Sequence, residues 1–124
     1  MICFIAILSC VYASLEGVVQ AFYYRNYNNT DINIHGLYMF QRAIVGIILF
    51  SFTNIFFFLF FLFSFSFFHN GFYYWTRNIL DDNIYRARFT DTSTTSKAFL
   101  EFNFSQRTIL FIMGLIFFYL SVNY

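Results

Sequence analysis

The sequence predicts an all-α integral membrane protein with three transmembrane helices, and three observations carry that prediction. Sixty per cent of the 124 residues are apolar and 10% are charged, whereas an average domain carries about 25% charged residues. The run from 43 to 68 contains no charged side chain, and about 20 apolar residues suffice to cross a bilayer as a helix. Phe fills that run, whereas Tyr and Trp gather at its edges, as headgroup anchors do. We treat 1–124 as a single membrane domain.

The first predicted span covers residues 2–24 and carries one carboxyl group, Glu16. A secretory signal is the alternative, because Val11, Tyr12 and Ala13 resemble a small-residue cleavage site. No Lys or Arg precedes the apolar core, which favours a transmembrane helix. A carboxylate inside a span costs roughly 2.5–3.5 kcal/mol on insertion scales, so Glu16 should face protein or water. It is therefore the candidate for an intramembrane proton relay; otherwise it lies near its helix end and reaches outward.

The second predicted span covers residues 43–68 and the third covers residues 108–124. Polar loops are expected at 25–42 and 76–107. Within the second span, Asn54 cannot satisfy its amide fully by bonding to its own helix, so we expect it to face a neighbouring helix.

The longer loop, 76–107, predicts the orientation of the chain. It holds five basic residues against two in the loop 25–42, so it should stay on the side of the membrane where the chain is made. Three spans then place the N-terminus on that same side and the C-terminus on the other. Within this loop, residues 77–89 carry apolar side chains at helical spacing. They predict a short amphipathic helix that could lie on the membrane surface.

Composition and spacing exclude several classes of function. The net charge is +1 and no basic stripe is present, so nucleic acid is not an expected partner. Cys3 and Cys10 are too few for a disulfide framework, and no further Cys or His stands at the spacing of a zinc site. The sequence also lacks a phosphate-binding glycine motif. We therefore expect no metal site and no catalytic residue in this chain.

Three residues around the end of the second predicted span are candidates for cofactor contact. His69 follows the apolar run, and Arg77 and Asp82 come after it. A His at a membrane boundary can ligate haem, and Arg and Asp can bind a quinone headgroup. The alternative is an interfacial His followed by an ordinary solvated helix.

The composition itself carries a resemblance to a group of known proteins. Phe, Ile, Tyr and Asn make up 56 of the 124 residues and Pro is absent; all four residue types can be encoded by triplets of A and T alone. The chain resembles the small hydrophobic respiratory-chain subunits encoded by AT-rich mitochondrial genomes of protists such as ciliates. That resemblance implies a multi-pass protein of the mitochondrial inner membrane that takes part in oxidative phosphorylation. The implied partners are other membrane subunits and lipids such as cardiolipin.

Within this resemblance the first expectation is a subunit of complex I, NADH:ubiquinone oxidoreductase. Its role would be a non-catalytic, structural or helper one in electron transport and proton translocation, with no cofactor of its own. The segment from His69 to Asp82 is also similar to the membrane anchors of succinate dehydrogenase, in which His69, Arg77 and Asp82 would contact haem b or ubiquinone. Subunits of cytochrome c oxidase or of the ATP synthase membrane sector are further alternatives. A free-standing carrier or channel would need inward polar residues on several spans, and only Glu16 and Asn54 qualify.

Overall fold

The computed structural model describes residues 1–26, 34–81, 88–90 and 101–124. Within these ranges the secondary structure is helical and no strand occurs, as predicted. The helices are α1 (Ile2–Asn26), α2 (Ile34–Phe52), α3 (Ile55–Leu80) and α4 (Phe104–Asn123).

The length and composition of these helices confirm the membrane prediction. Three helices are long and apolar enough to cross a membrane, namely α1 over Ile2–Arg25, α3 and α4. The helix α2 is a shorter apolar helix over Gly36–Phe52. The chain is therefore a multi-pass membrane protein.

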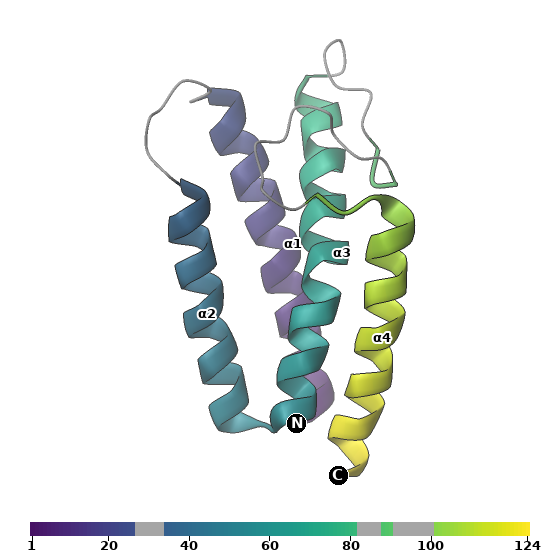
Figure 1. Cartoon of the computed structure of the whole chain (residues 1–124). Coiled ribbons are helices and arrows are strands. Elements are labelled where there is room, and N and C mark those ends of the chain that lie inside the picture. The colour runs from purple at the N-terminus through teal and green to yellow at the C-terminus, as the bar shows by residue number, and fades with distance from the viewer. Residues whose placement is uncertain (27–33, 82–87, 91–100) are drawn as a thin grey trace.

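The helices run alternately up and down, with α3 in the middle of the bundle (Figure 1). The α3 helix packs extensively against α1 and α4, and more lightly against α2. The α1–α2 and α3–α4 connections leave from one end of the bundle, here called the loop end, and both chain termini lie at the opposite end (Figure 1). The expected placement of the termini on opposite sides therefore does not hold for this arrangement.

The predicted continuous span over 43–68 is divided into two helices by a turn at Thr53 and Asn54. The Oδ1 atom of Asn54 caps α3 by accepting a hydrogen bond from the amide of Phe57 at 3.0 Å. The Nδ2 atom of Asn54 donates to the carbonyl oxygen of Ser121 in α4 at 3.0 Å. The expectation that Asn54 faces a neighbouring helix is thus confirmed, but from a turn and not from mid-span. An N-cap side chain replaces helical hydrogen bonds that the turn loses.

The polar loops are shorter than predicted at each described boundary. Residues 34–42 belong to α2, α3 continues to Leu80, and α4 begins at Phe104. A capping box starts α4: the Asn103 side chain accepts from the amide of Gln106 at 2.9 Å, and the Gln106 side chain accepts from the amide of Asn103 at 3.0 Å. Of the predicted amphipathic helix over 77–89, residues 77–80 form the last turn of α3, residues 88 and 89 are not helical, and residues 82–87 lie outside the described residues.

Small residues set the contact between α1 and α3. Ala13, Gly17 and Ala21 recur every fourth residue of α1, and both alanines are almost fully buried. A Cβ atom at Gly17 would overlap the carbonyl oxygen of His69 and would lie 3.1 Å from the amide nitrogen of Tyr73. Small residues allow helix backbones to approach closely in membranes, so this stripe brings α1 directly onto the backbone of α3.

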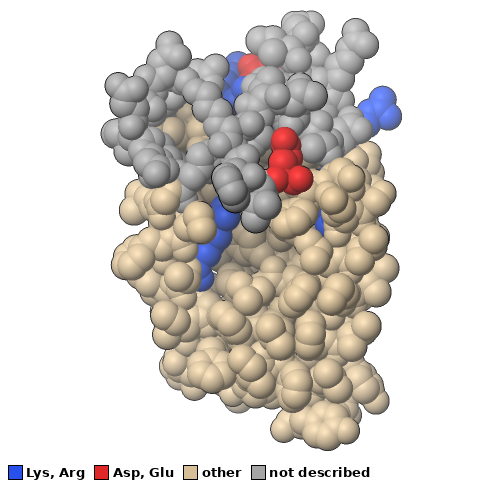
Figure 2. Space-filling view, viewed as in Figure 1, with Lys and Arg blue, Asp and Glu red and all other residues tan. Residues whose placement is uncertain are grey.

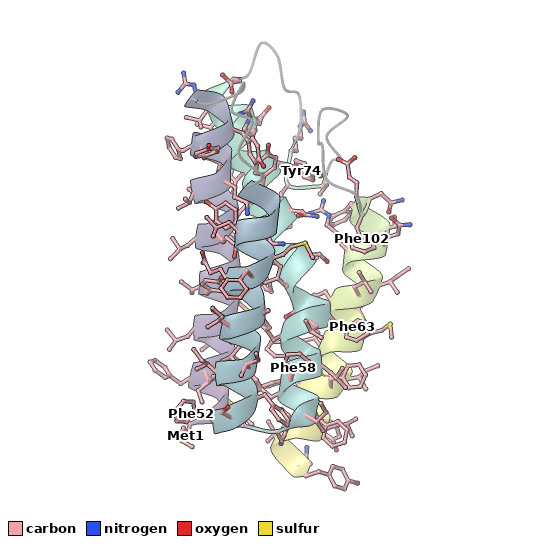
Figure 3. The ribbon with its side chains drawn as sticks, turned by 60° about the vertical axis from the view of Figure 1, so that its left-hand side comes forward. Met1, Phe52, Phe58, Phe63, Tyr74 and Phe102 are labelled. Carbon is pink, nitrogen blue, oxygen red and sulfur yellow. The ribbon has the colours of Figure 1, made fainter. Side chains whose placement is uncertain are left out.

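Aromatic rings fill the other helix contacts. Phe58 of α3 lies 6.3 Å from Phe50 of α2, and Phe63 of α3 lies 5.3 Å from Phe117 of α4, between ring centroids (Figure 3). Large apolar side chains cover the outward faces and are exposed; they include Phe4, Ile7, Leu15, Val19, Ile44, Ile47, Ile109, Ile112 and Ile116. These faces suit lipid or apolar partner surfaces.

Candidate functional site

Charged side chains are confined to part of the bundle. Residues 1–15, 43–76 and 108–124 contain none, so the end that carries the termini has no charged side chain. The lower part of the face shown in Figure 2 accordingly has neither basic nor acidic atoms. Two charged residues, Glu16 and Arg42, nevertheless lie near the midpoints of their helices. They form the centre of the candidate site.

The Glu16 carboxylate is buried between helices, with its side chain 2% exposed. This position agrees with the expectation that an acid within a span faces protein. It does not agree with the alternative in which Glu16 reaches outward from a helix end. Gln20, one turn further along α1, donates to Oε1 of Glu16 from Nε2 at 3.0 Å.

Arg42 of α2 neutralises the buried carboxylate. Its Nε atom donates to Oε1 of Glu16 at 2.7 Å, and its second terminal nitrogen, Nη2, lies 2.5 Å from the same oxygen. The other carboxylate oxygen, Oε2, is buried and has no hydrogen-bond partner among the described residues. The guanidinium also lies over the Phe65 ring, 4.6 Å from its centroid, which adds a cation–π contact.

His69 of α3 completes the cluster. Its Nε2 atom lies 3.2 Å from Nη2 of Arg42 and 3.7 Å from Oε1 of Glu16. Its Nδ1 atom lies 2.8 Å from Oδ1 of Asn70, and its ring stacks on Phe65 at 5.3 Å. The side chain of His69 is 9% exposed. We call Glu16, Arg42 and His69 the buried triad.

The local sequence explains why the triad can form. Gly17 follows Glu16 and contacts the backbone at His69, so the close approach of α1 and α3 places the carboxylate beside the imidazole. Arg42 comes from an antiparallel helix that passes the same level. At the edge of the triad, Gln41 donates to the hydroxyl oxygen of Tyr12 at 3.0 Å. A carboxylate, an imidazole and a phenol in one cluster are groups that can exchange protons.

The other predicted site residues lie elsewhere. Arg77 is 3% exposed and lies about two helical turns beyond His69 towards the loop end. It donates to the carbonyl oxygen of Ala21 at 3.4 Å and lies 3.4 Å from Oδ2 of Asp81. Asp82 falls outside the described residues. The structure therefore brings His69 to Glu16 and joins Arg77 to the end of α1.

A second buried cation, Arg107, belongs to α4 and not to the predicted loop 76–107. It is 0% exposed and donates from Nη2 to the carbonyl oxygen of Phe89 at 2.9 Å. The rings of Tyr74, Phe104 and Phe89 surround it at 5.5, 5.6 and 5.9 Å from its guanidinium carbon. Tyr74 also donates to Oε1 of Glu101 at 3.1 Å. Arg107 thus ties α4 to Tyr74 of α3 and to Phe89.

The sequence does not indicate Arg42 as a site residue, because Arg42 directly precedes the long apolar run and falls within the predicted loop 25–42. The spacing of Ala13, Gly17 and Ala21 was an available signal for the α1 face that bears the site, since small residues every fourth position favour close helix packing. No group of three His, Cys, Asp or Glu side chains that could hold a metal ion occurs in the ranges that the structure describes. No protein-family model, curated protein or solved structure matches the chain.

Proposed function

We propose that this chain is an integral membrane subunit of a respiratory-chain complex in the mitochondrial inner membrane, with complex I as the first candidate. Its role is a non-catalytic one, in which it supports electron transport and proton translocation. The observation that carries the proposal is the buried triad at the middle of helices whose outer faces are apolar. Ionisable groups at this depth are costly, and in membrane proteins they commonly mark ion or proton pathways.

The mitochondrial part of the proposal is supported by composition. Residue types encoded by A and T alone dominate the chain, and Pro is absent. This bias is typical of proteins encoded by AT-rich organelle genomes. Such genomes encode chiefly the hydrophobic subunits of respiratory complexes.

The subunit part of the proposal is supported by the helix surfaces. The α2 helix is only lightly packed on α3, and its outward residues Leu37, Phe40, Ile44 and Ile47 are exposed. Helices with such faces can pack against neighbouring membrane subunits and lipids such as cardiolipin.

The succinate dehydrogenase alternative requires His69, Arg77 and Asp82 to contact haem b or ubiquinone. A haem ligand needs a free ring nitrogen, but Nε2 of His69 faces Arg42 and Nδ1 faces Asn70. Haem b therefore does not fit His69 as the triad is arranged. This favours a proton-handling role for His69. Membership in cytochrome c oxidase or in the ATP synthase membrane sector is a further alternative, and the purification described next also tests it.

The test is to purify the tagged chain from its own membranes in mild detergent and to identify the proteins that accompany it. We expect complex I subunits, together with NADH:ubiquinone oxidoreductase activity, in the same fraction. Recovery of succinate dehydrogenase subunits with a haem spectrum that His69→Ala removes would instead support the alternative. A stable monomer that migrates away from every dehydrogenase and oxidase activity would overturn the proposal.

A further inference from the structure

We propose that Nε2 of His69 is a proton-binding site, and that a proton bound there displaces Arg42 from the buried triad and loosens the loop-end half of α2. Proton binding at His69 and the displacement of Arg42 involve this chain alone, so this proposal does not depend on the proposed function.

The contacts of His69 define which of its nitrogens carries hydrogen. A guanidinium group can only donate hydrogen bonds, so Nε2, at 3.2 Å from Nη2 of Arg42, must accept. Oδ1 of Asn70 can only accept, so Nδ1, at 2.8 Å, must donate. Both contacts are hydrogen bonds only when the imidazole is neutral and carries its hydrogen on Nδ1.

A second proton on the ring is incompatible with that arrangement. When an N–H bond forms at Nε2, the acceptor becomes a donor, and two positively charged donors then face each other across 3.2 Å. The carboxylate of Glu16 is the nearby acceptor, since its Oε1 atom lies 3.7 Å from Nε2. Its buried Oε2 atom, which has no hydrogen-bond partner in the described part of the chain, offers a further position.

The imidazolium and the guanidinium are then two like charges 3.2 Å apart, which cannot keep these positions beside the carboxylate. The Nε2–H group turns to Glu16, and Arg42 moves towards the outside, where 29% of its side chain is already exposed. The proton comes from hydronium of the aqueous phase, so an O–H bond breaks as the N–H bond forms. No electron transfer is involved.

The charged and titratable groups around His69 come from each neighbouring helix. On α1 these are Glu16 and, beside it, the Tyr12 hydroxyl. On α2 they are Arg42 and, facing the carboxylate, Tyr38. The charged side chain of α4, Arg107, lies instead among Tyr74, Phe89 and Phe104.

The position of α2 makes it the element that responds. Near the terminal end, its Phe50 contacts Phe58, and the turn at Thr53 and Asn54 attaches it directly to α3. Nearer the loop end, the polar contacts of α2 with α1 and α3 include those of Arg42 and of its neighbour Gln41. Displacement of Arg42 removes the stronger of these ties, so the loop-end half of α2 can move away from α1 while the turn holds its other end.

The experiment follows the proton and the helix in the same sample of the full chain in lipid nanodiscs. Nitrogen-15 NMR of labelled histidine reports the hydrogens on His69, and infrared spectroscopy reports a protonated carboxyl group. For the distance, Cys3 and Cys10 are replaced by Ser, and spin labels are attached at Met39→Cys on α2 and Ile79→Cys on α3, two exposed positions near the loop end. We expect the label separation to lengthen at the same pH at which Nε2 gains its hydrogen.

Two variants make the expectation specific. His69→Gln supplies a neutral acceptor for Arg42, and the label separation should then stay short at every pH. Asn70→Asp places a carboxylate beside Nδ1 and should move the transition upward by about one to three pH units. Asn78→Asp adds the same charge about two turns away on α3 and is the matched control, which should leave the midpoint within a few tenths of a pH unit. If His69→Gln does not fold, Asn70→Asp and its control still decide the question.

Three results would overturn the proposal. One is a proton that appears on the Glu16 carboxyl group while the His69 nitrogens do not change. Another is a label separation that does not vary with pH. The third is a separation that varies equally in the wild type and in His69→Gln.

Discussion

Arg42 and Glu16 stabilise the bundle only as a pair. The carboxylate is almost fully buried and accepts two hydrogen bonds through its Oε1 atom from Arg42 and Gln20. Taking either charge out of water alone is costly, and their mutual attraction at short range offsets part of that cost. The same reasoning explains why Glu16 and Arg42 can lie near the midpoints of apolar helices.

Removal of the guanidinium should therefore destabilise the protein strongly. We expect Arg42→Gln to lower the free energy of unfolding by about 3–5 kcal/mol, because it leaves a buried carboxylate without its counter-charge. The measurement is reversible unfolding in mixed micelles by increasing denaturing detergent. In the double variant with Glu16→Gln, a large part of this loss should be recovered.

Arg25→Gln provides the matched control for that experiment. Arg25 pairs with Asp81 at 3.5 Å, but its side chain is 46% exposed, and an exposed ion pair contributes about 0–1 kcal/mol. Equal losses from Arg42→Gln and Arg25→Gln would show that the buried pair has no special energetic role.

At the level of helices, Gly17 determines how closely α1 approaches α3. We expect Gly17→Ala to force the two helices apart, because its Cβ atom would overlap the carbonyl oxygen of His69. The cost of such overpacking is typically about 1–3 kcal/mol. The measurement is again the free energy of unfolding in mixed micelles, together with the His69 NMR signal, which should shift as the triad opens.

Gly114→Ala is the corresponding control on α4. A Cβ atom there would lie 3.4 Å from the nearest atoms of Phe60 and Ser64, which is ordinary contact. We therefore expect Gly114→Ala to lower the free energy of unfolding by less than about 1 kcal/mol. The interpretation of the α1–α3 contact fails if Gly17→Ala is as well tolerated as Gly114→Ala.

The turn between α2 and α3 depends on Asn54. We expect Asn54→Ala to destabilise the protein by about 1–2 kcal/mol, the usual cost of losing an N-cap, and to weaken the tie to the carbonyl of Ser121. Asn54→Ser keeps a capping oxygen and should recover most of the N-cap contribution. Unfolding free energies of the two variants measure the difference, and equal losses would place the stabilising effect in the contact with Ser121 instead.

The helical class and the first and last helices were predictable because α1 and α4 are each long, mostly apolar and not divided by a turn. The break between α2 and α3 was not predictable from the same reasoning, because Thr53 and Asn54 are the chief polar residues there and no Gly or Pro accompanies them. Glu16 was identified from its rarity within a span, whereas Arg42 was not. The pairing of Arg42 with Glu16 requires α2 to be a helix that runs antiparallel to α1. That arrangement depends on the turn at Thr53 and Asn54, which the sequence pattern does not indicate.

In the molecule as a whole, the chain termini lie away from the charged side chains. Both termini lie at the end without charged side chains, and the α3–α4 connection, whose sequence contains three basic residues, leaves from the loop end (Figure 1). Basic residues favour the side of the membrane where synthesis occurs. The α2 helix has 19 residues and a length of about 28 Å, close to the thickness of the hydrocarbon core of about 30 Å.

We therefore expect both termini on the side opposite to synthesis. Epitope tags at the two ends should be cleaved together by protease added to that side of sealed vesicles. A cysteine placed at the exposed Arg88 should react with a membrane-impermeant maleimide only from the other side. Tags that become accessible from opposite sides would show instead that α2 does not cross the membrane.

The turn at Thr53 and Asn54 has a consequence for biogenesis. Because residues 43–76 contain no Asp, Glu, Lys or Arg, insertion of the chain moves no ionised side chain across the bilayer in this turn. The α2–α3 hairpin can therefore enter lipid as one unit after α1. Arg42 then meets Glu16 as the hairpin docks, so neither charge has to remain alone in lipid while the ribosome completes the chain.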